Sequence, residues 1–516
     1  MASYLSVDIY QVFYIIAAFF LSVLLLKTFQ MFQKRWALVK ALESFPGPPT
    51  HWLYGNTHQF LHDNSLLVRT QEWALQYPYA TPVWFGKFVV YVNITHPDYA
   101  KTLLARADPK DNFGYKYLIP WIGQGLLVSS GQKWFQHRRL LTPAFHYDIL
   151  KAYVKLMSDS THVMLNILQD EVTEGTSVDI CPYVTTMTLD TLMKCLFGYK
   201  GNSRTDRDNP YQQAVIELSH LIYKRFFCIP YHSDLIFSLS PDGWKFRRLC
   251  GIAHDYTDRV IKERRESLQH EEELEQIRQN RHLDFLDILL CARYENGKSL
   301  SDEDLRAEVD TFMFEGHDAT ASGISWILHH MAQNPEHQQK CREEVQELLG
   351  DRDTIEWDDL NQLPYTTMCI KESLRFCPAI PLIARQLSKP MTFCDGRSLP
   401  AGCLVSLCVI SIHMNPEFWK DPEVFDPLRF SPENSAHRHP HAYIPFSGGP
   451  RNCIGQTFAM NELKVALALI LNMFELAPDP TKPPYKQAIV ALKSENGIHL
   501  KLTKLQGKKR NSRSRP

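Results

Sequence analysis

The chain has 516 residues, of which 44% are hydrophobic and 22% are charged, so it can bury a large core. Its length alone predicts about three domains of average size. The formal net charge is −1, so the chain lacks the basic field that attracts nucleic acid, and we expect no nucleic-acid partner.

An uncharged apolar run, Ile9–Leu26, lies near the N-terminus. It just reaches the roughly 18 residues that a helix needs to span a membrane. A cleaved signal peptide fits less well, because no Lys or Arg precedes the run and no small-residue cleavage site follows it. The basic residues that follow are Lys27, Lys34, Arg35 and Lys40. By the positive-inside rule they predict a membrane anchor with the rest of the chain in the cytosol, where the sequon Asn93-Ile94-Thr95 stays unmodified.

The segment Phe45-Pro46-Gly47-Pro48-Pro49 predicts a stiff hinge after this anchor. No long Ser/Gly/Pro linker and no internal repeat follows up to about residue 505. We therefore expect one large catalytic domain in place of the three domains that length suggests. The predicted boundaries are residues 1–44 for the anchor and its basic flank, 45–505 for the domain and 506–516 for a basic, disordered tail.

Helical patterns dominate the domain, and one of them opens with Ser301 and Asp304, which resemble a capping box. Short alternating runs predict strands. This composition of elements predicts a mostly α fold with small β-sheets. The helix candidates are Leu305–Met331, Glu336–Leu349 and Gln456–Leu471, and the strand candidates lie in Pro82–Asn93 and Met391–Val409.

Two segments have no single interpretation from sequence. Phe226–Leu239 is apolar and is broken by Pro230, so it is either core or a second, shallow membrane contact beside an entrance for apolar substrates. Ile261–Asp284 is dense in charge and predicts a solvated helix followed by a loop.

Two pairs of residues have spacings that suit specific contacts. Trp134 and Arg138 lie about one helical turn apart and together offer an indole N–H and a guanidinium group to a carboxylate. Glu372 and Arg375 are three residues apart, so they share a helix face and can form an ion pair. Neither pair alone identifies a function, because such salt bridges arise often by chance.

The strongest motif is the ten-residue segment 446–455, FSGGPRNCIG, which contains Cys453. Its glycines allow close approach of the backbone and positive φ angles. Arg451 supplies a cation two residues before the cysteine, and a helix from about Gln456 directs its positive end at the sulfur. These are the features that a thiolate ligand of haem iron needs. The segment matches the haem-ligand signature F-x-x-G-x-R-x-C-x-G of the cytochromes P-450 at every fixed position, and the chain resembles that family.

The resemblance assigns roles around the haem. It implies that Cys453 is the axial ligand of the iron. Phe425-Asp426-Pro427-Leu428-Arg429-Phe430 resembles the family's "PERF" segment, which implies a structural ion network of Glu372, Arg375 and Arg429 beneath the haem. The resemblance further implies that the haem propionates are held by Trp134, Arg138, Arg385 and Arg451.

Residues 315–320, EGHDAT, resemble the family's oxygen-binding A-G-x-D-T-T. The resemblance implies that Gly316 lets the helix approach the porphyrin and that Asp318 and Thr320 deliver protons. The segment Val309–Asp318 resembles the fourth P-450 family, the fatty-acid ω-hydroxylases, in many of which this glutamate is esterified to a haem methyl. That implies a covalent haem ester at Glu315, while Ala319 departs from the usual threonine.

The resemblance implies a microsomal enzyme of the endoplasmic reticulum membrane, whose domain faces the cytosol and carries haem b. It would use O2 and electrons from NADPH–cytochrome P-450 reductase, with cytochrome b5 as a further partner, to hydroxylate fatty acids at or near the ω carbon. The family fold is a mostly helical prism with small sheets. Two alternatives stay open: a broader xenobiotic or lipid monooxygenase, and a haem-binding protein whose turnover is poorly coupled because of Ala319.

Other metal sites are not expected. The twelve cysteines form no C-x-x-C pair, which disfavours a structural zinc site, and in a cytosolic domain we expect reduced thiols without structural disulfides. His437, His439 and His441 alternate, but Pro440 breaks the regular geometry that a shared metal would need.

Overall fold

The computed structural model describes residues 9–60, 65–171, 176–199, 209–268, 284–292 and 299–505. The α-helices are α1 (Ile9–Ala41), α2 (Ser65–Gln76), α3 (Pro97–Leu104), α4 (Ile119–Ile122), α5 (Gly131–Leu141), α6 (Tyr147–Glu171), α7 (Cys181–Leu196), α8 (Pro210–Phe227), α9 (Asp234–Leu239), α10 (Pro241–Ser267), α12 (Phe285–Cys291), α13 (Asp302–Gln333), α14 (Pro335–Leu349), α15 (Pro364–Phe376), α16 (Val409–His413), α17 (Pro432–Ser435) and α18 (Gln456–Met473). The predicted tail, 506–516, lies outside the described residues.

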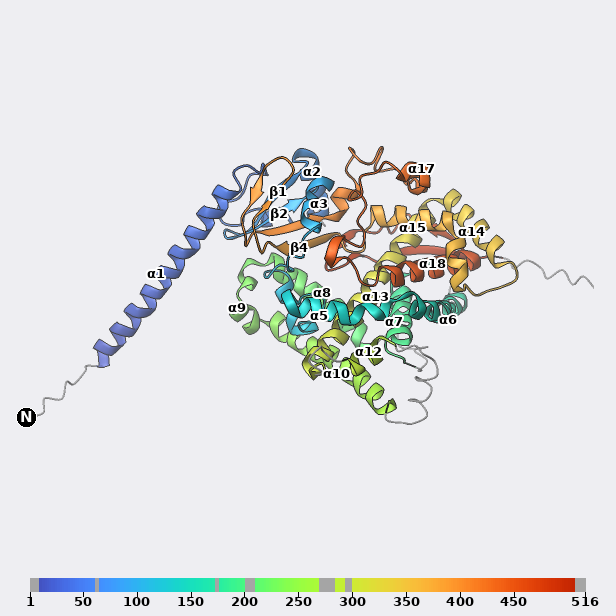
Figure 1. Cartoon of the computed structure of the whole chain (residues 1–516), viewed down its shortest axis with the longest axis horizontal. Helices are drawn as coiled ribbons and strands as arrows, with labels where there is room; N and C mark the ends of the chain where they lie inside the picture. Colours follow the sequence, from blue (N-terminus) through green and yellow to red (C-terminus); the bar gives the residue numbers. More distant parts are fainter. Residues whose placement is uncertain are drawn as a thin grey trace, which may run out of the picture.

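The N-terminal helix α1 projects from the body as a long rod (Figure 1). It is apolar and long enough to cross a membrane, and its apolar part is not buried against the rest of the protein. The helix continues beyond the predicted span and ends at Ala41, just before the Pro-rich hinge. Its last turns pack on the body, where the rings of Phe32 and Phe88 lie 5.7 Å apart and Arg35 donates to the carbonyl of Lys87.

The largest of the small sheets lies at the end of the body from which α1 leaves (Figure 1). The largest has the order β1-β2-β7-β4, in which β2 and β7 run parallel and the other neighbours run antiparallel. The predicted strand segments Pro82–Asn93 and Met391–Val409 both contribute to it. The strands are β1 (Ala80–Phe85), β2 (Val89–Ile94), β3 (Ser177–Asp179), β4 (Leu382–Gln386), β5 (Met391–Thr392), β6 (Ser398–Leu399), β7 (Leu404–Cys408), β8 (Phe474–Pro478), β9 (Lys486–Ala488), β10 (Leu492–Ser494) and β11 (His499–Lys504).

Helix α13 forms the centre of the helical part and contacts α7, α10, α15 and α18. It begins where the sequence predicts, because the Ser301 hydroxyl accepts a hydrogen bond from the backbone N–H of Asp304 at 3.0 Å. Nearly all its side chains from Leu305 onward are buried, so the helix has no solvent face over most of its length. The three predicted helices are confirmed, with ends that differ from the prediction by at most three residues.

In the segment Phe226–Leu239, some apolar side chains are buried in the core and others are exposed. Phe227 and Phe237 are buried, as a core segment requires. Leu235, Ile236 and Leu239 on α9 are 50–68% exposed, which leaves an apolar edge on the surface. Of the charged stretch Ile261–Asp284, α10 covers the part up to Ser267, and residues 269–283 lie outside the described residues.

Candidate active site

Cys453 lies in a tight loop between a short 3-10 turn, Gly449–Arg451, and the start of α18. Its backbone N–H donates to the carbonyl of Phe446 at 3.0 Å, which closes the loop. Gly449 has φ +67°, and a Cβ there would lie 1.8 Å from the carbonyl oxygen of Leu104, so only glycine fits. The loop thereby presents the sulfur to an internal cavity of about 450 Å³.

The cavity does not by itself favour a thiolate. Burial, together with the nearby Glu315 carboxylate, raises the pKa of Cys453 to about 11, although Arg138 opposes the rise. A thiolate at neutral pH therefore needs a stronger positive charge close to the sulfur, and a metal ion supplies such a charge. The donor chemistry of the loop thus suits a metal ligand better than a free nucleophile.

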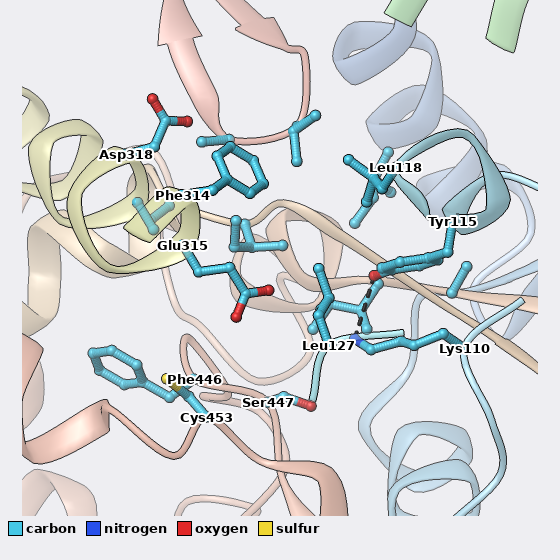
Figure 2. A pocket seen from close by; sticks show the side chains of 18 of the residues that line it. Lys110, Tyr115, Leu118, Leu127, Phe314, Glu315, Asp318, Phe446, Ser447 and Cys453 are labelled. Atoms are coloured by element: carbon cyan, nitrogen blue, oxygen red, sulfur yellow. Dashed lines mark hydrogen bonds between the residues drawn. The ribbon is translucent and has the colours of Figure 1, made fainter. Parts of the chain in front are cut away.

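Helix α13 faces the sulfur across the cavity and contributes Glu315, whose side chain extends toward Cys453 (Figure 2). Within the described residues the Glu315 carboxylate has no hydrogen bond or ion pair. Its pKa is raised to about 7, mainly by burial and in part by the charge of Glu308, although Lys110 opposes the rise. A carboxyl group without a protein partner thus faces the sulfur.

The other predicted residues of α13 also line the cavity but differ in their contacts. The Asp318 carboxylate points away from Cys453 (Figure 2), and its Oδ1 lies 2.5 Å from Nζ of Lys493. The Thr320 hydroxyl donates to the carbonyl of Gly316 at 2.8 Å. A Cβ on Gly316 would lie 2.5 Å from Cδ1 of Leu192, so the absence of a side chain serves the packing of α13 against α7.

Cationic side chains gather at one side of the cavity. Arg451 stacks 4.5 Å from the centre of the Trp134 ring and donates one N–H to the carbonyl of Ser129. Its Nε and Nη1 are buried and have no acceptor within the described residues. Arg385 is 4% exposed, and no described carboxylate pairs with it. Unsatisfied guanidinium donors of this kind are suited to a ligand that carries carboxylates.

Arg138 holds the cysteine loop directly. Its Nη1 donates to the backbone carbonyl of Asn452 and its Nη2 to the side-chain oxygen of the same residue, both at 2.9 Å. Asn452 directly precedes Cys453, so this guanidinium group fixes the loop at the ligand. The predicted contact of Arg138 with a propionate stays a prediction.

Lys110 is a residue of this site that the sequence did not indicate. Its Nζ donates to the Tyr115 hydroxyl at 3.3 Å, and both side chains line the cavity (Figure 2). Burial and the nearby Arg385 lower the pKa of Lys110 well below its usual range. Lys110 follows Asp108-Pro109 in a loop without a motif, so only the folded chain brings it here.

These features together fit a haem. The cavity has the sulfur of Cys453 on one side and helix α13 on the other. The cationic side chains of Lys110, Arg138 and Arg451 also line it. A flat macrocycle with two propionates and a central iron would satisfy both the thiolate and the free guanidinium donors. The described residues hold no other cluster of three His, Cys, Asp or Glu side chains that could bind a metal.

The predicted ion pairs behind the cysteine loop are present. Glu372 and Arg375 on α15 pair through two hydrogen bonds of 2.8 and 2.9 Å, and both side chains are fully buried. Nε of Arg429 lies 3.4 Å from Oε1 of Glu372. The same oxygen accepts from the backbone N–H of Asp426 at 2.9 Å, so the network ties α15 to the segment around Arg429.

Comparisons with known proteins agree with this geometry. The family model "Cytochrome P450" matches residues 45–501. The chain is 55% identical to cytochrome P450 4B1 of Rattus norvegicus over 94% of this chain and 95% of the relative. It is 53% identical to cytochrome P450 4A6 of Oryctolagus cuniculus over 94% and 95%, and 53% identical to cytochrome P450 4A11 of Homo sapiens over 94% and 93%.

A solved structure gives the same result for the fold. The crystal structure of the cytochrome P450DA heme domain superposes with a TM-score of 0.77 at 25% sequence identity, and the match covers 90% of this chain and 98% of that one. With the family model spanning nearly all of the body, the helix-rich fold and the Cys453 loop have one explanation: the chain belongs to the cytochrome P450 family and is a haem-thiolate monooxygenase.

Proposed function

We propose that this enzyme hydroxylates fatty acids at or near their terminal carbon. The observation that carries the proposal is that Cys453 and Glu315 face each other across one cavity whose remaining wall is largely aliphatic and aromatic. An apolar wall suits an alkyl chain and offers few polar groups to a more oxygenated substrate. The similarity of Val309–Asp318 to the ω-hydroxylases, which led to the same prediction, supports this substrate class.

The residues that would hold haem b follow from the cavity. Cys453 would ligate the iron, and Arg451, Arg385, Arg138 and Trp134 would hold the propionates. When bound, the haem activates O2 with reductase-supplied electrons, and the thiolate favours O–O cleavage. Lys110 lines the same cavity and would offer a further N–H donor to a propionate.

Glu315 would carry an ester to a haem methyl. Two features of the cavity support this assignment: the carboxylate extends toward the centre of the cavity, and no described side chain pairs with it. A terminal C–H bond is harder to cleave than an internal one, so terminal selectivity needs a rigid approach to the iron. A tether through Glu315 would supply rigidity on the substrate side.

The enzyme would work at the endoplasmic reticulum membrane with NADPH–cytochrome P-450 reductase, and cytochrome b5 as a further partner. Helix α1 would span the bilayer. On α9, the exposed side chains of Leu235, Ile236 and Leu239 would insert into the surface of the bilayer, so that lipid substrates enter from the membrane. Exposed aromatic side chains near the end of α1, Trp36 and Trp52, are of the type found at the membrane interface.

The decisive experiment is product analysis of the full-length protein, reconstituted with reductase and lipid, over a series of medium- and long-chain fatty acids. We expect the terminal alcohol to be the main product. Oxidation of other lipids or xenobiotics without fatty-acid products would favour the broader monooxygenase. NADPH consumption without product from any lipid would favour a poorly coupled haem-binding protein.

A further inference from the structure

The hairpin of β9 and β10 reaches into the active-site cavity. Its strands pair antiparallel, with Leu492 opposite Ala488. The turn between them, Ile489, Val490 and Ala491, lines the same cavity as Cys453 and Glu315. Apolar side chains at this turn therefore contact whatever alkyl chain occupies the cavity.

Helix α13 holds this hairpin with three polar side chains on one face. The Ser322 hydroxyl and the Trp326 indole N–H both donate to the carbonyl of Leu492, at 2.5 and 3.0 Å. One turn earlier, Asp318 accepts from Nζ of Lys493 at 2.5 Å. The spacing 318, 322, 326 is that of a single helix face. On its other side the hairpin is fixed by the N–H of Leu492, which donates to the carbonyl of Ala379 at 2.8 Å.

The Asp318–Lys493 ion pair is the charged contact among these. Asp318 is 4% exposed and its carboxylate points away from Cys453, so its charge is directed at the hairpin (Figure 2). Lys493 is 24% exposed and therefore reaches from solvent to a buried carboxylate. A buried carboxylate is costly without a partner, and Lys493 is the cation that pairs with it among the described residues.

We propose that the Asp318–Lys493 pair is a positioning device for regioselectivity: it holds the β9–β10 turn at a fixed depth in the cavity and so sets which carbon of the substrate reaches the iron. Asp318 and Lys493 are then positioning residues, since they act through Ile489, Val490 and Ala491. The proposal rests on the fatty-acid function given above. It assigns Asp318 a task separate from the proton delivery that its motif implies.

A displacement of the turn changes the product because the substrate chain has few polar contacts to hold it. In an apolar cavity the register of an alkyl chain depends on the shape of the wall. Placement errors of about 1 Å at a reacting centre can change rates by about two orders of magnitude. A less firmly held turn should therefore allow internal carbons of the substrate chain to reach the iron, and this should lower the share of terminal alcohol among the products.

The test is a double-mutant cycle in the full-length, reconstituted holoenzyme: Asp318→Asn, Lys493→Gln and the double variant. The readout is the ratio of terminal to internal alcohols, which does not depend on the total rate. We expect each single variant to lower the ratio by at least about threefold, and the double variant to change it no further than either single one. Lys493→Arg should restore the ratio, because it restores the cation.

Controls separate this device from a proton relay and from loss of fold. Ser322→Ala removes a second contact to the hairpin and should shift the ratio in the same direction. Lys501→Gln removes an exposed lysine on β11 and should leave the ratio unchanged. The proposal would be overturned if Asp318→Asn slowed turnover without changing the ratio of terminal to internal alcohols and Lys493→Gln also left that ratio unchanged. Asp318 would then act only in proton delivery.

A second measurement keeps the device testable without fatty-acid turnover. Hydrogen exchange of the hairpin amides, residues 488–494, should quicken in Asp318→Asn and in Lys493→Gln but not in Lys501→Gln. If exchange is faster in both variants but the wild type forms no fatty-acid products, the substrate assignment is wrong, while the positioning of the hairpin by the ion pair is supported. Unchanged exchange in both single variants would refute the device whatever the substrate.

Discussion

Nδ1 of His137 lies 2.5 Å from Oε1 of Glu308, and the two side chains are 1% and 0% exposed. The other carboxylate oxygen of Glu308 accepts from the backbone N–H of Leu126 at 3.0 Å. One turn earlier on both helices, Lys133 and Asp304 pair at 2.5 Å. Two polar contacts thus join α5 to α13, next to Arg138, which holds the cysteine loop through Asn452.

Breaking the buried pair should therefore destabilise the enzyme. We expect Glu308→Leu to cost about 3–5 kcal/mol of unfolding free energy, because it removes one partner of a buried polar pair. Glu308→Gln should cost less, because the amide oxygen can still accept from the N–H of Leu126 and the amide N–H can donate to Nδ1 of His137 in its other tautomer. Denaturant unfolding of the holoenzyme measures both, and an equal loss in the two variants would contradict a role for the hydrogen bonds.

Arg451 should control haem retention. Its Nε and Nη1 are buried without an acceptor among the described residues, so a bound propionate would gain charge-assisted hydrogen bonds from them. In a Glu315→Ala background, which excludes the ester, we expect Arg451→Met to speed haem transfer to excess apomyoglobin by about tenfold or more. Arg69→Met changes an exposed arginine paired with Glu72 and is the matched control. Equal rates of haem transfer in the two variants would show that Arg451 does not bind a propionate.

Local motifs allowed much of this site to be predicted. Helical spacing allowed an ion pair of Glu372 and Arg375, and the family resemblance assigned that pair to the haem side. Cys453 was predicted from the ten-residue loop that contains it. The same holds for α13, whose start follows from the Ser301 cap and whose burial follows from its apolar sequence. In each case the determining interactions lie within a few residues of one another.

The remainder depends on contacts between distant segments, which no local spacing encodes. Lys493 is 175 residues from Asp318, and His137 is 171 residues from Glu308. Lys110 enters the site from a loop without regular structure. The predicted role of Gly316 illustrates the same limit, because the sequence identified the residue but could not show that Leu192 is the neighbour that requires it.

Restoring a threonine at position 319 should improve coupling. Ala319 lines the cavity without a hydroxyl, and the hydroxyl of Thr320 already donates to the carbonyl of Gly316. Ala319→Thr would add a proton-conducting group at the cavity wall. We expect product formed per NADPH consumed to rise by about twofold or more, with less hydrogen peroxide released. Ala319→Val has nearly the same shape without the hydroxyl, and an equal rise in that variant would show that volume is responsible.

Stability should depend on pH through Glu462. This glutamate on α18 is 1% exposed, and burial raises its pKa to about 8, although the Thr191 hydroxyl opposes the rise. A carboxyl group with a higher pKa in the folded state favours folding when it is protonated. Its contribution is therefore complete below the unfolded pKa, near 4.5, and is lost as the pH rises through about 8.

Glu462→Gln keeps a neutral group of the same shape at every pH. Its Tm should match that of the wild type near pH 4, below the unfolded pKa, and exceed it increasingly from about pH 4.5 to about pH 8, after which the difference should level off at the equivalent of a few kcal/mol. Thermal unfolding at a fixed scan rate over this range measures the difference. A Tm difference that is constant across the range would mean that Glu462 does not titrate there.

The ester at Glu315 should be visible as haem that stays with the polypeptide. After turnover, denaturation in acidified organic solvent should leave part of the haem absorbance on the wild-type protein. Glu315→Ala should release all of it, because it removes the carboxylate whose side chain extends toward Cys453 (Figure 2). Glu308→Gln changes a glutamate two turns earlier on α13 and should retain bound haem, which excludes a general effect of lost charge. Complete extraction from turned-over wild-type enzyme would mean that no ester forms and that terminal selectivity depends on the cavity wall alone.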